Sequence, residues 1–104
     1  MNTSNVWFVY LLLCDQKTFY VGITSDIVVR IAQHKKKQSF YTKQFSDISL
    51  TYCEQYRTEK EAVTREKQLK GWSHAKKQKL INGILGINRC TELVEELLVH
   101  GRTT

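Results

Sequence analysis

Residues 6–13 form an unbroken run of aromatic and branched apolar residues, Val-Trp-Phe-Val-Tyr-Leu-Leu-Leu. Such residues favour strands, and the run lacks the polar alternation that a strand with one solvated face would show. The run therefore predicts the central strand of a sheet. A chain of 104 residues can build one hydrophobic core but is too short for two, so we expect a single domain over residues 1–104.

The segments that follow predict a small α+β fold. Polar residues 15–17 separate the first run from a second strand at 18–23, so the two strands should form a hairpin. Residues 24–26 offer side-chain oxygens that can cap a helix, which then continues to the lysines at 35–37. After a polar loop, residues 48–52 alternate apolar and polar side chains as a third strand should.

Helices dominate the second half of the chain. Thr58 and Glu61 have the spacing of a capping box and start a second helix, which Gly71 can end in the left-handed conformation. A third, lysine-rich helix follows, which Ser73 can cap. The predicted order is β-β-α-β-α-α-α, with a three-stranded sheet flanked by helices. The core should cover about residues 6–81, and a helical extension should occupy about residues 82–100.

The positive charge of the chain lies in its middle. The formal net charge is +6, and residues 30–79 hold 13 Lys and Arg against 5 Asp and Glu. A basic surface attracts polyanions through counterion release, so nucleic acid is the first candidate partner. We expect its phosphates to contact Lys35, Lys36, Lys37, Lys70, Lys76, Lys77 and Lys79.

The three cysteines predict neither a zinc site nor a redox motif. Cys14, Cys53 and Cys90 show no C-x-x-C spacing, which fits a reduced, cytoplasmic protein. The apolar run at 6–14 is too short to span a bilayer, and it lacks the basic start and the cleavage site of a signal peptide. We therefore expect no membrane partner.

Five reactive polar side chains stand on otherwise apolar elements: Tyr10, Tyr20, Arg30, His34 and Glu66. The hairpin brings Tyr10 and Tyr20 near each other. Arg30 and His34 are four residues apart and share one face of the first helix. Together these residues supply two phenols, a cation, an imidazole and a carboxylate, a set that suits the cleavage of a phosphodiester.

Glu66 lies on the inward stripe of the second helix, between Ala62 and Leu69. A half-buried carboxylate needs a cation beside it, because an unpaired ion away from water costs several kcal/mol. Two explanations stay open at this point. Glu66 either pairs with Lys67 or Lys70 or binds a metal ion.

The ordered set of residues resembles the GIY-YIG nuclease superfamily, particularly its small stand-alone bacterial members. The resemblance covers roughly residues 6–81 and includes the segments 22–26 and 70–73. It rests on Phe8-Val9-Tyr10, on Tyr20-Val21-Gly22 ten residues later, on Arg30 and His34 of one helix, and on Glu66 of a later one.

The resemblance implies a metal-dependent endonuclease that hydrolyses phosphodiester bonds in DNA or structured nucleic acid, in repair, recombination or nucleic-acid processing. It implies a small mixed sheet with a shallow active site on its face. Glu66 would bind one Mg²⁺ or Mn²⁺ ion, and Arg30 would hold the scissile phosphate. Tyr10 would be the general base, with Tyr20 hydrogen-bonding around it. His34 is the rival base.

Some positions depart from the motifs of the family. Phe8 stands in place of a glycine, Val9 and Val21 stand in place of isoleucines, and the family's late asparagine has no clean counterpart. None of these departures removes a proposed catalytic group. Gly22 is retained, and its role would be structural, since a glycine lets a strand bend or approach a ligand closely.

Two alternatives to the enzyme remain open. The chain would be a catalytically inactive nucleic-acid-binding module if Glu66 only paired with a lysine and the tyrosines only packed the sheet. A protein that interacts through its carboxy-terminal helix would show no dependence on salt or metal. We expect DNA rather than RNA as the nucleic acid, with specificity supplied by the shape of the substrate, a protein partner or a second copy of the chain.

Overall fold

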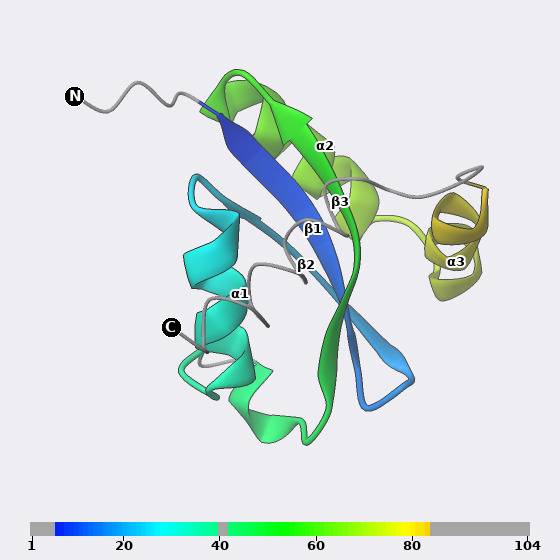
Figure 1. Cartoon of the computed structure of the whole chain (residues 1–104). Helices are drawn as coiled ribbons and strands as arrows, with labels where there is room; N and C mark the ends of the chain where they lie inside the picture. Colours follow the sequence, from blue (N-terminus) through cyan, green and yellow to red (C-terminus); the bar gives the residue numbers. More distant parts are fainter. Residues whose placement is uncertain (1–5, 40–41, 84–104) are drawn as a thin grey trace.

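The computed structural model describes residues 6–39 and 42–83. The elements follow in the order β1 (Trp7–Cys14), β2 (Thr18–Thr24), α1 (Ile27–Lys35), the short 3₁₀ helix η1 (Thr42–Gln44), β3 (Ile48–Tyr56), α2 (Glu59–Lys70) and α3 (His74–Asn82) (Figure 1). This is the predicted α+β order. The last predicted helix lies outside the described residues. No helix in the described part is both long and apolar enough to cross a membrane.

The sheet has the strand order β2-β1-β3, so the first apolar run is its central strand, as predicted. β1 pairs antiparallel with both neighbours. The mixed sheet implied by the resemblance is therefore wrong for the described strands. A tight turn joins β1 to β2 and reverses the chain, and β3 returns along the other edge of β1 in the same direction as β2.

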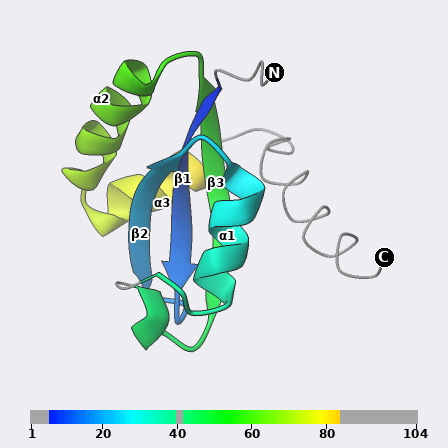
Figure 2. The ribbon, with the colours of Figure 1, turned by 90° about the vertical axis from the view of Figure 1, so that its left-hand side faces the viewer.

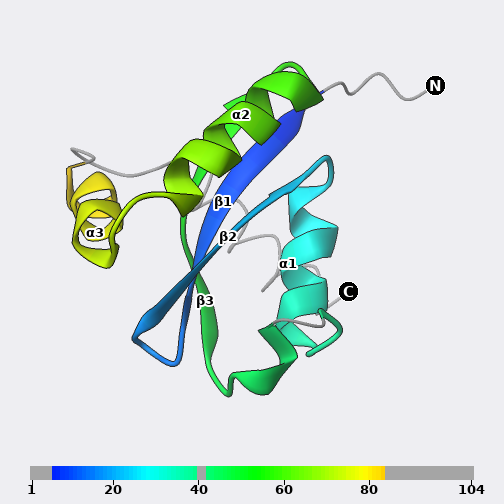
Figure 3. The same ribbon diagram turned by 180° about the vertical axis from the view of Figure 1, so that it is seen from behind.

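Helices cover both faces of the sheet, which explains why β1 carries no polar alternation. Tyr10 and Leu12 of β1 pack with Ile27 and Ile31 of α1 on one face. The other face packs against α2 and α3, with Leu11 of β1 in that cluster. Figure 2 shows α1 on one side of the sheet and α2 and α3 on the other, and Figure 3 shows α2 lying along the sheet from behind. The molecule therefore has three layers, with the sheet between α1 and the pair α2 and α3, and a site on β1 lies inside this arrangement.

Two sets of hydrogen bonds fix the segment that precedes β3. Asp15 in the β1–β2 turn accepts hydrogen bonds from the backbone N–H groups of Ser46 and Asp47, at 2.9 and 2.8 Å. The Lys37 ammonium, just after α1, donates to the carbonyl oxygens of Phe45 and Ser46. The segment that carries η1 is thus tied both to the hairpin and to the end of α1.

β3 continues to Tyr56, beyond the alternating residues that predict it. A bulge interrupts the alternation and changes which side chains face each side of the sheet. Leu11 lies opposite Tyr52 and Leu12 lies opposite Leu50, so Thr51 is the extra residue. Its hydroxyl donates to the Leu11 carbonyl at 3.0 Å. Before the bulge the apolar side chains of β3 face α1, whereas Tyr52 faces α2 after it.

The helix starts are those that the sequence predicts, since Asp26, Thr58 and Ser73 each accept a backbone hydrogen bond as N-caps. The end of α2 differs from the prediction. Gly71 has φ −83° and is not left-handed, because its N–H closes the last turn onto the Gln68 carbonyl at 3.1 Å. A side chain should therefore be tolerated at this glycine.

Burial on both faces of β1 predicts a large cost for shortening one of its side chains. Leu11 is fully buried, so Leu11→Ala should lower the free energy of unfolding by about 2–5 kcal/mol in urea titrations. Val29 of α1 is 50% exposed, and Val29→Ala should change the stability by roughly 0.5 kcal/mol or less. Equal losses in the two variants would contradict this assignment of the core.

Candidate active site

Tyr10 and His34 form the buried centre of the candidate site. Tyr10 lies on β1 and is 1% exposed, and His34 lies in the last turn of α1 and is fully buried. The Tyr10 hydroxyl and His34 Nε2 are 2.9 Å apart and share a hydrogen bond, with the ring centroids 5.7 Å apart in an edge-on arrangement. The fold thus joins a residue of the central strand to one 24 positions later in the chain.

Tyr20 completes a cluster of three rings. It lies on the edge strand β2 and is partly exposed, with its ring centroid 6.3 Å from that of Tyr10 and 5.2 Å from that of His34. The hairpin therefore brings the two tyrosines together, as the sequence predicts. Tyr20 is the member of the cluster that reaches the surface.

A fourth residue, Thr42, contacts the cluster from behind and was not predicted from the sequence. Thr42 Oγ1 lies 2.7 Å from His34 Nδ1, and the threonine is fully buried at the start of η1. It belongs to a stretch that the sequence presents only as a polar loop. One buried threonine there leaves no periodic signal, so only the tertiary contact identifies it.

Gly22 makes room for the ring of Tyr10. The two residues are direct partners across β1 and β2. A Cβ atom on Gly22 would lie 2.5 Å from the Tyr10 hydroxyl oxygen and 2.6 Å from Cζ, far inside normal contact distance. The tyrosine ring thus lies directly over the glycine, and the reason for this glycine is space for Tyr10.

Arg30 and Glu66 contribute opposite charges near the Tyr10 phenol. Burial raises the pKa of Tyr10 far above its ordinary value, with a further rise from Tyr20, while Arg30 lowers it and Glu66 raises it. Figure 2 shows the two helices that carry these charges, α1 and α2, on opposite sides of the edge strand β2. Both side chains are partly buried. Tyr20 and His34 therefore contact Tyr10, whereas Arg30 and Glu66 act on its phenol electrostatically.

His34 is neutral at physiological pH. Burial, and then the neighbouring Arg30, lower its pKa from 6.5 to about 4. Both of its ring nitrogens lie at hydrogen-bond distance from other side chains, Tyr10 and Thr42. A neutral imidazole with both nitrogens engaged is better suited to orienting a neighbour than to taking a proton from water.

Glu66 forms the salt bridge that the sequence left open, and it also suits a weakly held metal ion. Its carboxylate lies 3.2 Å from the Lys70 ammonium, where Lys70 is 57% exposed and Glu66 is 17% exposed. Among the described residues, no group of three or more His, Cys, Asp or Glu side chains is placed to hold a metal. A single carboxylate fits Mg²⁺ or Mn²⁺, which commonly bind one or two carboxylates and complete their shell with waters and substrate phosphate.

The seven lysines expected to contact phosphate do not gather at one place. Lys35, Lys36 and Lys37 lie at the end of α1, whereas Lys76, Lys77 and Lys79 belong to α3 on the opposite side of the sheet (Figure 1). Lys37 is engaged with backbone carbonyls and Lys70 with Glu66. Lys76 lies over the Trp72 ring, 4.4 Å from its centroid. Basic groups therefore lie on both sides of the sheet.

A second polar cluster lies where α2 meets β3, outside the predicted site. The Glu54 carboxylate accepts two hydrogen bonds from Arg65, both at 2.9 Å, and one each from the hydroxyls of Tyr52 and Tyr56. Hydrogen bonds from Arg65 and the tyrosines hold the pKa of Glu54 below its ordinary value, although burial acts in the opposite direction. The cluster fixes α2 against the sheet one residue before Glu66.

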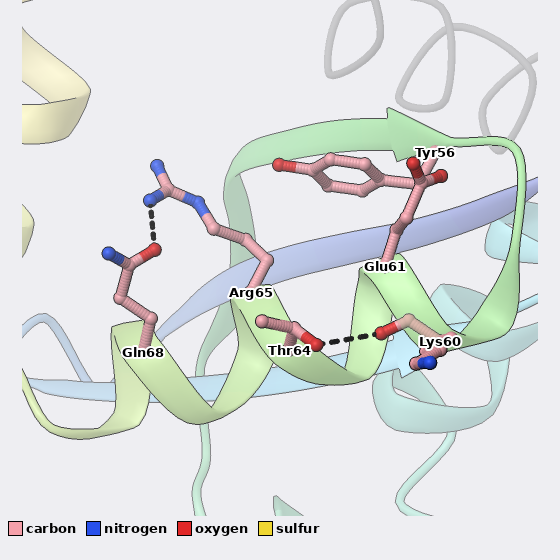
Figure 4. A pocket seen from close by; sticks show the side chains of 6 residues that line it. All are labelled: Tyr56, Lys60, Glu61, Thr64, Arg65 and Gln68. Carbon is pink, nitrogen blue, oxygen red and sulfur yellow. Dashed lines mark hydrogen bonds between the residues drawn. The ribbon is translucent and has the colours of Figure 1, made fainter.

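A pocket beside this cluster does not contain the candidate catalytic residues. It is lined by Tyr56, Lys60, Glu61, Thr64, Arg65 and Gln68, with Arg65 donating to Gln68 at 2.6 Å (Figure 4). The sequence pattern did not single out Glu54 or Arg65, because the bulge in β3 decides which side chains face α2. Their arrangement explains the position of the helix.

The contact between Gly22 and Tyr10 predicts a specific steric effect. Gly22→Ala should displace Tyr10 and lower the free energy of unfolding by about 1–3 kcal/mol, the usual cost of overpacking. Gly71→Ala is the matched control, since its Cβ would meet no atom closer than 3.5 Å and its φ is ordinary. Thermal and urea unfolding measure both effects. The assignment fails if the two variants are equally stable.

The low pKa of His34 predicts a loss of stability in mild acid. The unfolded chain binds a proton on His34 near pH 6.5, whereas the folded chain stays neutral there until about pH 4, so acid favours unfolding. Between pH 7 and pH 5 this group should cost the folded state about 2 kcal/mol. Urea titrations at the two pH values measure it. His34→Gln should show a smaller change, and an identical change in both proteins would refute the explanation.

Known proteins are similar to this chain in sequence and in fold. Residues 6–79 match the family described as the GIY-YIG catalytic domain. UPF0213 proteins of Staphylococcus aureus strains Mu3 and N315 are each 36% identical over 75 residues, which cover 71% of this chain and 92% of theirs.

A solution structure of a UPF0213 protein from Bacillus halodurans is also similar. Its TM-score is 0.50 at 29% identity, and the match covers 74% of this chain and 83% of that one. The family match over residues 6–79 spans the hairpin, the sheet and the helices that carry the five site residues. The chain therefore belongs to the GIY-YIG family of nuclease domains.

Proposed function

We propose that this protein is a divalent-metal-dependent endonuclease that hydrolyses phosphodiester bonds in DNA. The observation that supports it most is the hydrogen-bonded pair of Tyr10 and His34, with Tyr20 against both rings and the charges of Arg30 and Glu66 acting on the Tyr10 phenol. Tyr10, Tyr20 and His34 come from three separate elements, β1, β2 and α1. Membership of the GIY-YIG family supports the interpretation of this arrangement as a nuclease site.

Glu66 would hold the metal ion in this proposal. A bound Mg²⁺ or Mn²⁺ supplies positive charge for the phosphate oxygens and makes a bound water more acidic. The Lys70 ammonium that now pairs with Glu66 is mostly exposed, so the pair contributes little and can be exchanged. With one carboxylate as anchor, we expect modest affinity for the metal until nucleic acid binds.

Arg30 would bind the scissile phosphate. Its guanidinium presents a planar fork of donors that matches two phosphate oxygens. A lysine has no such fork, so Arg30→Lys should be a poor substitute. The charge of Arg30 also lowers the pKa of Tyr10, which favours loss of its proton when the site is loaded.

Tyr10 would first lose its own proton to solvent and then, as a phenolate, accept the proton of the attacking water, while His34 would hold the tyrosine in place. In the free protein Tyr10 is a phenol, because burial opposes its ionised form. His34 binds protons weakly and has both nitrogens engaged, which favours Tyr10 over His34 as the base. Tyr20, the partly exposed ring of the cluster, would form hydrogen bonds around the attacking water.

The remaining parts of the proposal concern substrate and setting. Lysines on α1, α2 and α3 would bind the nucleic-acid backbone from several sides without reading its sequence. Specificity would then come from the shape of the DNA, from a protein partner or from a second copy of the chain. We place this nuclease in one domain and in the cytoplasm, with a role in repair, recombination or nucleic-acid processing.

A catalytically inactive nucleic-acid-binding module is the second candidate. It is favoured by one observation, the salt bridge between Glu66 and Lys70, which satisfies the carboxylate without a metal. Under this hypothesis the protein binds DNA in a salt-dependent manner and leaves every phosphodiester intact.

Cleavage of a panel of duplex, nicked, branched and single-stranded DNAs separates the two candidates. The wild-type chain should cut at least one substrate with Mg²⁺ or Mn²⁺ and none in chelator. Glu66→Gln and Arg30→Ala should each reduce the rate by roughly a hundredfold or more, because each removes a contact made in the transition state. Glu59→Gln, which neutralises an exposed acid in the first turn of the same helix, is the control and should keep the rate.

Binding measured at two salt concentrations completes this test. All four proteins should bind DNA and lose affinity as salt rises. Tight binding by the wild type with no cleavage of any substrate would favour the inactive module. If Glu66→Gln cuts as fast as the wild type, the proposed metal site is wrong.

A further inference from the structure

Three buried side chains are linked in a row by hydrogen bonds, and the row ends at the Tyr10 hydroxyl of the candidate site. Thr42 Oγ1 is 2.7 Å from His34 Nδ1, and His34 Nε2 is 2.9 Å from the Tyr10 hydroxyl. None of the three is more than 1% exposed. Water therefore has little access to these contacts, and the protons between them must be arranged by the side chains themselves.

Hydrogen bonds hold the backbone from Thr42 to Ser46. The Phe45 N–H donates to the Thr42 carbonyl at 3.0 Å, and the Lys43 N–H donates to the Ser39 carbonyl at 2.9 Å. Further along the same segment, the Lys37 ammonium donates to the carbonyl oxygens of Phe45 and Ser46. The threonine hydroxyl is therefore presented to His34 by an ordered segment.

A neutral imidazole carries one N–H, so the donors and acceptors along this row of hydrogen bonds can be arranged in one of two directions. In the first, Nδ1–H donates to Thr42, and the Tyr10 hydroxyl donates to the bare Nε2. In the second, the Thr42 hydroxyl donates to the bare Nδ1, and Nε2–H donates to the Tyr10 oxygen. A threonine hydroxyl can serve in either direction because it is both a donor and an acceptor.

The proposed chemistry distinguishes the two directions. To take a proton from water, Tyr10 must first lose its own proton, and its phenolate oxygen then needs hydrogen-bond donors around it. In the first direction the bare lone pair of Nε2 faces that oxygen and repels the negative charge. In the second direction the imidazole donates to the oxygen and supports it.

We propose that Thr42 is a positioning residue that donates its hydroxyl hydrogen to His34 Nδ1, holds His34 as the Nε2–H tautomer, and so makes His34 a hydrogen-bond donor to Tyr10. The hydrogen-bond chain follows from the contacts alone. Its effect on cleavage rests on the proposed nuclease function, because Thr42 acts through His34 and does not reach the reacting atoms.

The tautomer is measured directly by ¹⁵N NMR of the full chain labelled at histidine. The chain has three histidines, and loss of one pair of signals in His34→Gln identifies those of His34. Near pH 7 we expect Nε2 of wild-type His34 to be protonated and Nδ1 to be bare and hydrogen-bonded. A proton on Nδ1 in the wild type overturns the proposal without any substitution.

Three variants test whether Thr42 is responsible. Thr42→Val keeps the shape and removes the hydroxyl, so the Nδ1 signal should move to that of a nitrogen without a donor. Thr42→Ser restores the hydroxyl and should restore the signal. Thr51→Val is the control, since it removes a threonine hydroxyl that donates to the Leu11 carbonyl instead, and it should leave the His34 signals unchanged. An unchanged His34 signal in Thr42→Val overturns the proposal.

Cleavage provides the second measurement. Thr42→Val should cut about 10- to 100-fold more slowly, by analogy with the loss of a group that orients a metal-ligating histidine, while Thr42→Ser stays close to the wild type. A wild-type rate in a folded Thr42→Val protein refutes the catalytic part. If the wild type cuts nothing, the nuclease proposal fails, while the NMR result still decides whether Thr42 sets the tautomer.

Discussion

β1 is hydrogen-bonded to a strand on each side and covered by helices on both faces, so each polar group it carries inward has to find its partner inside the protein. Tyr10 is that group. Its hydroxyl is satisfied by His34, and His34 is satisfied in turn by Thr42. No buried side-chain nitrogen or oxygen in the described part of the chain lacks a hydrogen-bond partner. The candidate site is thus also the solution to burying a phenol in the middle of a sheet, and this couples the chemistry of the site to the stability of the fold.

Space and charge at the edge strand decide how the buried pair reaches the surface. Gly22 leaves room for the Tyr10 ring beside β2, and Tyr20 extends the cluster outward on the same strand. Arg30 and Glu66 then act on the phenol with opposite signs. Burial alone would keep Tyr10 protonated, so any role as a base depends on positive charge nearby. This is why an arginine within range, and a cation at Glu66, belong together in the proposed mechanism.

The position of Glu66 depends on contacts on the other face of the sheet. The bulge at Thr51 turns Tyr52 toward α2, and Glu54 binds Arg65 through two hydrogen bonds of equal length. Arg65 is the residue before Glu66, so this contact fixes the rotation of α2 and the direction in which Glu66 leaves it. A pair with one exposed partner, such as Glu66 with Lys70, contributes only about 0–1 kcal/mol. The Glu54 carboxylate binds Arg65 and also accepts hydrogen bonds from two tyrosine hydroxyls, so that pair is far harder to separate.

Local pattern in the sequence determined the elements: the apolar run fixed the central strand, the caps Asp26, Thr58 and Ser73 fixed the helix starts, and the spacing of Arg30 and His34 put them on one face. These features depend on neighbours a few residues apart, which is why they can be predicted. The tertiary structure alone decided the antiparallel strand order, the phase of β3 and the contact of Thr42 with His34. Each of these depends on contacts between distant segments, where one extra residue in a strand or one buried hydroxyl in a loop changes what meets, and no local pattern records it.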